Sequence, residues 1–273
     1  MTTMTAARAD AISARPGSLL RHTGYVAGRW LRASYRQPAL IAFTLVQPAI
    51  WLLLFGQLFK GIVELPGFSD SSYIGFLTPG IVMMTAMMTA GWSGTAFIAD
   101  MERGVMDRML TSPVRRGALM AGQLASAGFN TIIQTVLVFA FGIAAGARYD
   151  GGALGYLITV VVSMLVAIAF GSLSNAVALL TRDQNALIGI SQFVSLPLTF
   201  MSSIMMDPKL APHWVEVVAR FNPVDWAVVA ARQALSGSPD WGVVAEKGLA
   251  LLAFTLIVGW LSTRAFRTYQ TSA

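Results

Sequence analysis

The 273-residue chain contains no cysteine, only two histidines and only three lysines. The lack of cysteine excludes disulfides, thiolate metal ligands and thiol catalysis. The two histidines, His22 and His213, lie far apart in the sequence and form neither an H-E-x-x-H motif nor a histidine cluster for a metal. No lysine stands in a G-x-x-x-x-G-K-[ST] motif, so the chain has no P-loop of its own. We therefore expect no metal, no nucleotide cofactor and no catalytic residue in this chain.

Charge is scarce and clustered. Charged residues make up 12% of the chain, against about 25% in an ordinary soluble domain. Unbroken apolar runs disfavour a β-barrel, which would show short alternating segments, and helices without polar faces disfavour a soluble bundle. A membrane-spanning helix needs roughly 20 apolar residues. We predict an all-α integral membrane protein with six transmembrane helices, near 38–59, 73–99, 118–146, 154–180, 185–206 and 243–263.

The distribution of basic residues predicts the orientation. With six spans both termini lie on one side, which carries thirteen basic against five acidic residues, whereas the other side carries six against eight. Lys and Arg accumulate on the cytoplasmic side of a membrane. We therefore predict a plasma-membrane protein with cytoplasmic tails at 1–37 and 264–273 around a transmembrane domain at 38–263. Orientation accounts for the net charge of +6 without nucleic acid.

The first apolar run, at 38–59, is too long for a signal peptide and no small-x-small cleavage site follows it, so we expect it to be retained. The stretch before it, residues 18–36, has helical spacing: its arginines fall on one narrow arc and Trp30 lies opposite. This pattern is typical of a helix lying in the membrane surface. The alternative is a solvated basic tail. The residues that define the predicted interfacial helix are Arg21, Arg29, Trp30, Arg32 and Arg36.

The segment "MERGVMDRMLTSPVRRG", residues 101–117, interrupts the apolar sequence with six charged side chains. Asp100 to Leu110 can form about three helical turns with an apolar face, and Pro113 disfavours helical geometry at the residue before it. We predict a short amphipathic cytoplasmic helix between spans two and three. The alternative is a charged loop that only sets the topology.

These residues carry a family resemblance. The sequence entering span two matches the pattern Y-x-x-F-L-x-P-G at Tyr73, Phe76, Leu77, Pro79 and Gly80. The charged segment continues the pattern at Glu102, Arg103, Gly104, Arg108, Leu110, Pro113, Val114 and Arg115. Together they resemble ABC-2 type (type-2 exporter) permeases, in particular the daunorubicin- and multidrug-resistance permeases. Ser112 stands where many members of that family have threonine.

The resemblance implies a function for the charged segment and a set of partners. In the family this segment is the coupling helix, which docks on a separate P-loop ATP-binding cassette subunit; that subunit binds ATP and Mg. A second copy of the chain or a sister permease would complete the channel. The residues to which the coupling function is carried over are Glu102, Arg103, Gly104, Val105, Met106, Arg108, Met109, Leu110 and Pro113.

A longer outer stretch, 207–242, separates spans five and six. Asn222 suits an N-cap, Pro223 the first helical position and Asp225 the first turn, while Arg232 precedes the end of the helix. Trp214 and Trp226 lie in the same stretch, as expected near a membrane interface. We predict a pair of short re-entrant or interfacial helices. A helical cap on the outer surface is the alternative.

The methionines Met83, Met84, Met87 and Met88 have two readings, as ordinary core packing or as an adaptable lining of a transport pathway. No charge lies deep in a span, which disfavours an ion-coupled carrier, and no polar cluster there suggests an intramembrane enzyme. A purely structural membrane protein would not need a docking helix. We expect a bacterial ABC exporter permease for a lipophilic or amphiphilic molecule. Polysaccharide or glycolipid export, or an ATP-independent carrier, remain the alternatives.

Overall fold

The computed structural model describes residues 28, 38–61, 72–104, 116–206 and 212–271, without the side chains of 38–43, 116–120 and 265–271. Two predicted features lie outside this part of the chain. One is the interfacial helix with Arg21, Arg29, Trp30, Arg32 and Arg36, and the other is the stretch 105–115 of the predicted coupling helix.

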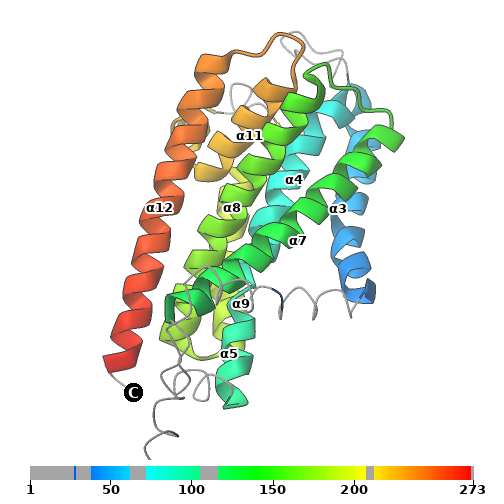
Figure 1. Cartoon of the computed structure of the whole chain (residues 1–273). Helices are drawn as coiled ribbons and strands as arrows, with labels where there is room; N and C mark the ends of the chain where they lie inside the picture. Colours follow the sequence, from blue (N-terminus) through cyan, green and yellow to red (C-terminus); the bar gives the residue numbers. More distant parts are fainter. Residues whose placement is uncertain (1–27, 29–37, 62–71, 105–115, 207–211, 272–273) are drawn as a thin grey trace, which may run out of the picture.

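All regular secondary structure in these ranges is helical, as the sequence predicts. The elements run in the order α3 (Pro38–Leu58), α4 (Tyr73–Gly91), α5 (Thr95–Glu102), α7 (Arg116–Ala144), α8 (Gly152–Thr181), α9 (Gln184–Phe200), α10 (His213–Ala219), α11 (Pro223–Leu235) and α12 (Trp241–Thr271). The long helices form an elongated bundle in which successive helices alternate in direction (Figure 1). The start of α3 and the end of α12 therefore lie at the same end of the bundle.

Four segments of the described chain are long and apolar enough to cross a membrane: the α4–α5 segment Tyr73–Glu102, and the helices within Ala121–Ala144, Gly152–Thr181 and Trp241–Arg264. The part of α3 whose side chains are described, Thr44–Leu58, is a shorter apolar helix, and α9 has 17 residues. The membrane character of the prediction is thus supported. The count of six spans stays a prediction.

One predicted boundary is wrong, because helix α9 ends at Phe200 rather than near residue 206. Helix α12 continues to Thr271, and the predicted span at 243–263 falls within its membrane-length segment Trp241–Arg264. The assignment of 264–273 as a cytoplasmic tail stays a prediction. The early end of α9 is explained by a residue that lies later in the chain, Asn222. The amide side chain of Asn222 donates hydrogen bonds to the carbonyl oxygens of Leu198 (2.7 Å) and Met201 (3.0 Å). These carbonyls at the end of α9 therefore have partners without a further helical turn.

Helix α8 occupies the middle of the bundle and packs against α4, α7, α9, α11 and α12 (Figure 1). Small residues permit this close packing, as is common between membrane helices. A Cβ built on Gly155 would lie 2.4 Å from the carbonyl oxygen of Ala234 on α11, closer than Cβ atoms approach another atom in real proteins. One on Gly142 of α7 would lie 2.7 Å from the hydroxyl of Thr78 on α4.

Candidate transport site and coupling element

The predicted second span at 73–99 lies within the membrane-length segment Tyr73–Glu102, and the structure shows a break inside this segment. Helix α4 ends at Gly91 and α5 begins at Thr95, and the turn between them leaves backbone groups without helical partners. Neighbouring helices supply these partners. The hydroxyl of Ser174 on α8 donates to the Gly91 carbonyl (2.5 Å) and accepts from the Gly94 amide (3.0 Å).

Two more side chains donate hydrogen bonds to backbone carbonyls in the same break. Ser191 on α9 donates its hydroxyl to the Gly91 carbonyl (2.8 Å), and Gln123 on α7 donates its amide to the Ser93 carbonyl (2.7 Å). Each of these polar residues bonds to the backbone of another helix, in an apolar setting where an unsatisfied group costs several kcal/mol. The break is therefore a specific feature built by three helices. It separates the long part of span two, α4, from the short part, α5.

Helix α5 leads directly into the charged segment. It ends at Glu102, Arg103 caps it, and Gly104 adopts the left-handed conformation with φ +63°. The chain therefore turns at Gly104, inside the predicted segment Asp100–Leu110, because glycine at positive φ ends a helix readily. The rest of the predicted coupling helix stays a prediction. Glu102 and Arg103 are exposed. The remaining predicted coupling residues, Val105, Met106, Arg108, Met109, Leu110 and Pro113, lie outside the described residues.

At the opposite end of the bundle, α11 begins as the sequence predicts. Asn222 is its N-cap: the side-chain oxygen accepts a hydrogen bond from the Val224 amide at 2.9 Å. Pro223 occupies the first helical position. The same Asn222 side chain also binds the end of α9, as described above, so a single buried residue fixes both helices. The N-cap was predicted from the sequence, and its second function was not.

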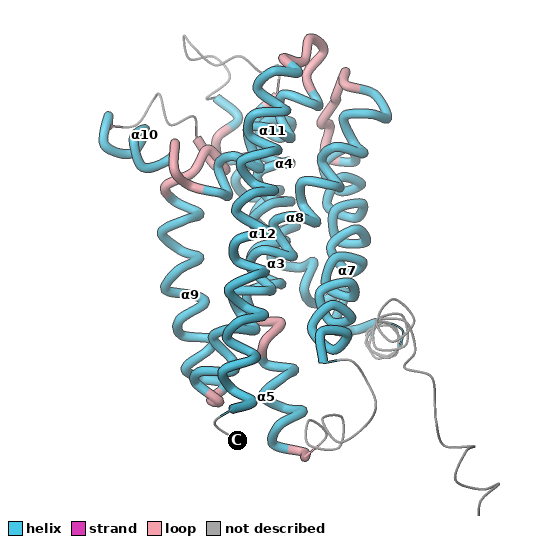
Figure 2. The backbone as a smooth tube through the Cα atoms, turned by 60° about the vertical axis from the view of Figure 1, so that its left-hand side comes forward, coloured by secondary structure: helices cyan, strands magenta, loops and turns pink. Residues whose placement is uncertain are grey.

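Helix α11 lies inside the bundle, against α4, α8 and α12. Its apolar positions Val224, Val228 and Ala231 are fully buried. The preceding α10 lies at the surface beside the end of α9 (Figure 2), and its Trp214 is 56% exposed. The paired helices are thus present, with α11 inserted among the long helices. Their depth in a bilayer stays a prediction.

Two charged residues hold α11 in this position. The Asp225 carboxylate accepts a hydrogen bond from the Ser203 amide at 2.8 Å. Arg232, two helical turns later, donates to the carbonyls of Phe76 on α4 (3.0 Å) and Ile204 (3.1 Å). The guanidinium carbon of Arg232 also lies 3.5 Å from the centre of the Phe76 ring. The sequence identified both residues only as signals for the start and end of a helix.

We call Asp225 and Arg232, with their partners Ser203, Ile204 and Phe76, the clamp on α11. The backbone of α4 comes very close to this clamp. A Cβ built on Gly80 would lie 2.6 Å from the carbonyl oxygen of Ile204. The residues after α9 thus fit against α4 because Gly80 has no side chain there. Trp226, the other predicted outer aromatic residue, donates its indole N–H to the Arg220 carbonyl at 2.7 Å and is half-buried. The outer predicted residues, except Trp214, therefore belong to one packed unit.

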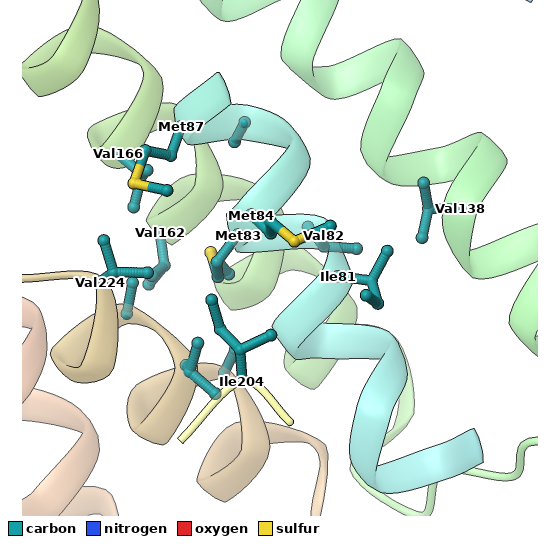
Figure 3. Close-up of a cluster of buried hydrophobic side chains, with 14 of the residues drawn as sticks. Ile81, Val82, Met83, Met84, Met87, Val138, Val162, Val166, Ile204 and Val224 are labelled. Carbon is teal, nitrogen blue, oxygen red and sulfur yellow. The ribbon is translucent and has the colours of Figure 1, made fainter. Parts of the chain in front are cut away.

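Three of the four methionines are buried. Met83, Met84 and Met87 are at most 2% exposed and pack in the core with Val166, Ile204 and Val224 (Figure 3). Met88 is half-buried, and together with Met84 it borders an apolar groove of 370 Å³ between α3 and α4. The groove is lined by Thr44, Val46, Gln47, Pro48, Ile50, Trp51, Met84, Thr85, Met88, Thr89 and Trp92. One of these lining residues, Trp92, lies in the break between α4 and α5. The burial of Met83, Met84 and Met87 supports core packing for these three, and Met88 stays a candidate for a pathway lining.

The sequence matches the profile of the family described as ABC-2 type transporter over residues 22–236, which is most of the chain. The chain belongs to the ABC-2 type transporter family. Among similar proteins, it is 31% identical over 271 residues to the daunorubicin resistance ABC transporter permease DrrB1 of Streptomyces coeruleorubidus, covering 97% of this chain and 88% of the relative. It is 24% identical to the inner membrane transport permease YadH of Escherichia coli K12, covering 84% and 90%.

The membership confirms the resemblance noted from Tyr73 to Arg115. It establishes this ABC-2 chain as a membrane transport permease homologous to a drug-resistance permease. The features described above therefore belong to one transport protein. They are the broken second span, the charged segment after α5, the α3–α4 groove and the inserted α11.

Proposed function

We propose that this ABC-2 permease is the membrane subunit of an ATP-driven exporter that moves a lipophilic or amphiphilic molecule out of the cytoplasm or the inner leaflet. The observation that carries the proposal is the position of α5: it links the charged segment to α4 through a break that three neighbouring helices stabilise. A movement of the charged segment would reach α4 through this short helix. The family relationship supports a transport function for that arrangement.

In this proposal a separate P-loop subunit binds ATP and Mg and docks on residues 102–113. Two permease chains, identical or sister copies, form the channel in a bacterial plasma membrane with all termini in the cytoplasm. Closure of the ATPase pair displaces the coupling segment. The displacement turns α5 relative to α4 at Gly94 and changes the packing of the second span. The outer clamp on α11 releases when α4 moves, because Arg232 binds the Phe76 carbonyl of that helix.

The groove between α3 and α4 supports an apolar cargo over a sugar polymer. It is lined mainly by aliphatic, methionine and tryptophan side chains, and methionine adapts to molecules of different shape. Daunorubicin, which appears in the name of the Streptomyces relative, is an amphiphile of suitable character for a first assay. Its transport by this permease is part of the proposal.

We expect the coupling segment to bind the ATPase subunit directly. Replacing Met109 and Leu110 with aspartate should abolish co-purification of a P-loop ATPase with the tagged permease, because charge replaces the apolar contact face predicted at 105–110. Drug efflux should fall to the level of cells without the permease. The measurement is a mild-detergent pull-down from native membranes, with stoichiometry from mass spectrometry, combined with efflux of a panel of amphiphilic drugs.

The matched control for this double variant is Phe193→Asn, a polar substitution outside residues 100–113, at a site on α9 that is 80% exposed. The control should retain both the ATPase and efflux. Equal membrane levels of all forms exclude a failure of insertion. Recovery of the ATPase with the double variant would refute the docking assignment, and a partner without a nucleotide site would refute the exporter proposal.

A bulky residue in the groove should block transport without affecting the ATPase. Met88 is half-buried at the groove wall, so Met88→Trp should reduce efflux of apolar drugs about tenfold, equivalent to ~1.4 kcal/mol in cargo binding. Phe193→Trp is the control at a surface position outside the groove. Unchanged efflux with Met88→Trp, measured at equal expression, would exclude the groove from the pathway.

A further inference from the structure

A second pocket lies at the end of the bundle away from α5, where three segments meet. It has a volume of 320 Å³ and lies between the start of α4, the α7–α8 turn and the end of α11. The segments are closely packed around it. The Gly151 amide donates to the Leu235 carbonyl at 3.0 Å, and a Cβ built on Gly237 would lie 3.2 Å from the Cβ of Asp150. The pocket is therefore a built feature of the fold.

Two arginines line this pocket, against a single carboxylate. Arg232 comes from α11, and Arg148 and Asp150 come from the α7–α8 turn. The bonds from Arg232 to Phe76 and Ile204 go to neutral carbonyls and fix the position of its guanidinium. Such a preorganised guanidinium loses little entropy when it binds an anion. Arg148 is exposed and adds a second positive charge at the rim.

The remaining wall is also suited to an anion. Ser72, the N-cap of α4, makes no capping hydrogen bond with its side chain, and the first turn of α4 contains no acidic residue. Ser72 and Gly75 both line the pocket. The amides of this first turn give the helix start a partial positive charge. The partial positive charge of the helix start adds to the positive electrostatic potential of the two arginines, which is the larger contribution.

Exposed apolar side chains are present on the two helices that the α7–α8 turn connects. Ile143 near the end of α7 is 51% exposed, and Leu154 and Leu157 at the start of α8 are 54% and 59% exposed. An acyl chain can lie against these side chains while its head group occupies the pocket. A charged head beside an apolar strip is the arrangement that an anionic amphiphile requires.

We propose that this pocket binds the phosphate head group of an anionic lipid. The site extends beyond the proposed export function, because it requires neither the ATPase nor the coupling segment. Arg148 and Arg232 hold the phosphate, the hydroxyl of Ser72 and the first turn of α4 complete its shell, and Asp150 limits its affinity. The acyl chains lie along α7 and α8.

The test uses the full-length permease purified in neutral detergent. Native mass spectrometry measures its binding of dioctanoyl phosphatidylglycerol, with dioctanoylglycerol as the uncharged analogue. We expect one saturable site for the phospholipid and none for the analogue. Arg148→Gln should weaken Kd about tenfold, Arg148→Lys less than about threefold, and Asp150→Asn should tighten Kd a few-fold. Arg220→Gln is the control, since Arg220 is exposed, lies outside the pocket and pairs with Glu216.

Each outcome decides the proposal. Equal binding of the uncharged analogue would overturn it, and so would equal losses in Arg148→Gln and Arg220→Gln, which would indicate surface charge alone. Competition by millimolar inorganic phosphate would identify a free phosphate site and overturn the lipid assignment. Phospholipid binding that resists inorganic phosphate but is lost in Arg148→Gln supports the lipid site. Efflux assays are independent of these measurements, so a failure here leaves the exporter proposal untouched.

Discussion

Replacing Arg232 with methionine is expected to lower the melting temperature of the purified permease by roughly 5–10 °C. The variant loses two charge-assisted hydrogen bonds, to Phe76 and Ile204, and the contact of the guanidinium with the Phe76 ring. Hydrogen bonds of charged groups contribute about 1.5–3 kcal/mol each and a cation–π contact about 0.5–2 kcal/mol. The lower end of their sum, about 3.5 kcal/mol, corresponds to a shift of about 6 °C in a chain of 273 residues, at an unfolding entropy of ~2.1 cal/mol/K per residue.

The same substitution should impair transport more than stability alone explains. In the proposed cycle α11 remains attached to α4 until α4 moves, so without Arg232 the outer end should open without ATP. We expect substrate-independent leak in vesicles and at least a tenfold loss of net efflux at a temperature well below melting. Melting is followed by intrinsic fluorescence and leak by release of a preloaded drug.

The control for this variant is Arg220→Met. Arg220 is exposed and pairs with Glu216 one helical turn away, and such surface pairs contribute about 0–1 kcal/mol. It should therefore shift the melting temperature by no more than about 2 °C and leave efflux unchanged. Equal effects of the two substitutions would show that Arg232 is an ordinary surface charge and that α11 is held by its apolar contacts alone.

The sequence predicts the helical class because apolar length depends only on local composition. A run without charge over residues 117–147 allows few structures other than a spanning helix, and α7 occupies Arg116–Ala144. The start of α11 was predictable for the same reason, since Asn222 and Pro223 act within one helical turn. Features of this kind require no knowledge of distant residues.

The break in span two was not predictable, because its cause lies elsewhere in the chain. "TAGWSGTAF" contains two glycines but no proline, and its hydropathy gives no reason to end a helix at Gly91. The partners that stabilise the turn, Gln123, Ser174 and Ser191, come from three other helices. Taken singly, each of them reads as a polar residue that packs between membrane helices. Only the assembled bundle shows that they converge.

The clamp on α11 was missed for a related reason. Asp225 at the start and Arg232 at the end of a short helix complement the helix dipole, and this local explanation is sufficient at the level of sequence. The structure shows that they contact Ser203, Phe76 and Ile204. One signal was available: a helix with so few polar residues is unlike a water-exposed helix, and charged residues on a buried helix need partners inside the protein.

Replacing Gly94 with valine is expected to abolish efflux while the ATPase stays bound. A Cβ at residue 94 would lie 2.5 Å from the carbonyl oxygen of Ser174, which is backbone and cannot rotate away. Helix α5 must then shift from α8, and the hydrogen bond from the Gly94 amide to the Ser174 hydroxyl is lost. Overpacking of this kind costs typically 1–3 kcal/mol, so the melting temperature should fall by roughly 3–10 °C.

The matched control is Gly189→Val on α9, where a Cβ built on the glycine would have no other atom within 4 Å. It should retain normal efflux and at least the original melting temperature, because valine has a higher helix propensity than glycine. Binding of the ATPase separates two explanations for Gly94→Val. If pull-down stoichiometry is normal while efflux is lost, the break transmits the movement of the coupling segment to α4. If efflux persists in a stable Gly94→Val protein, α5 does not need its contact with α8, and the coupling route through the second span is wrong.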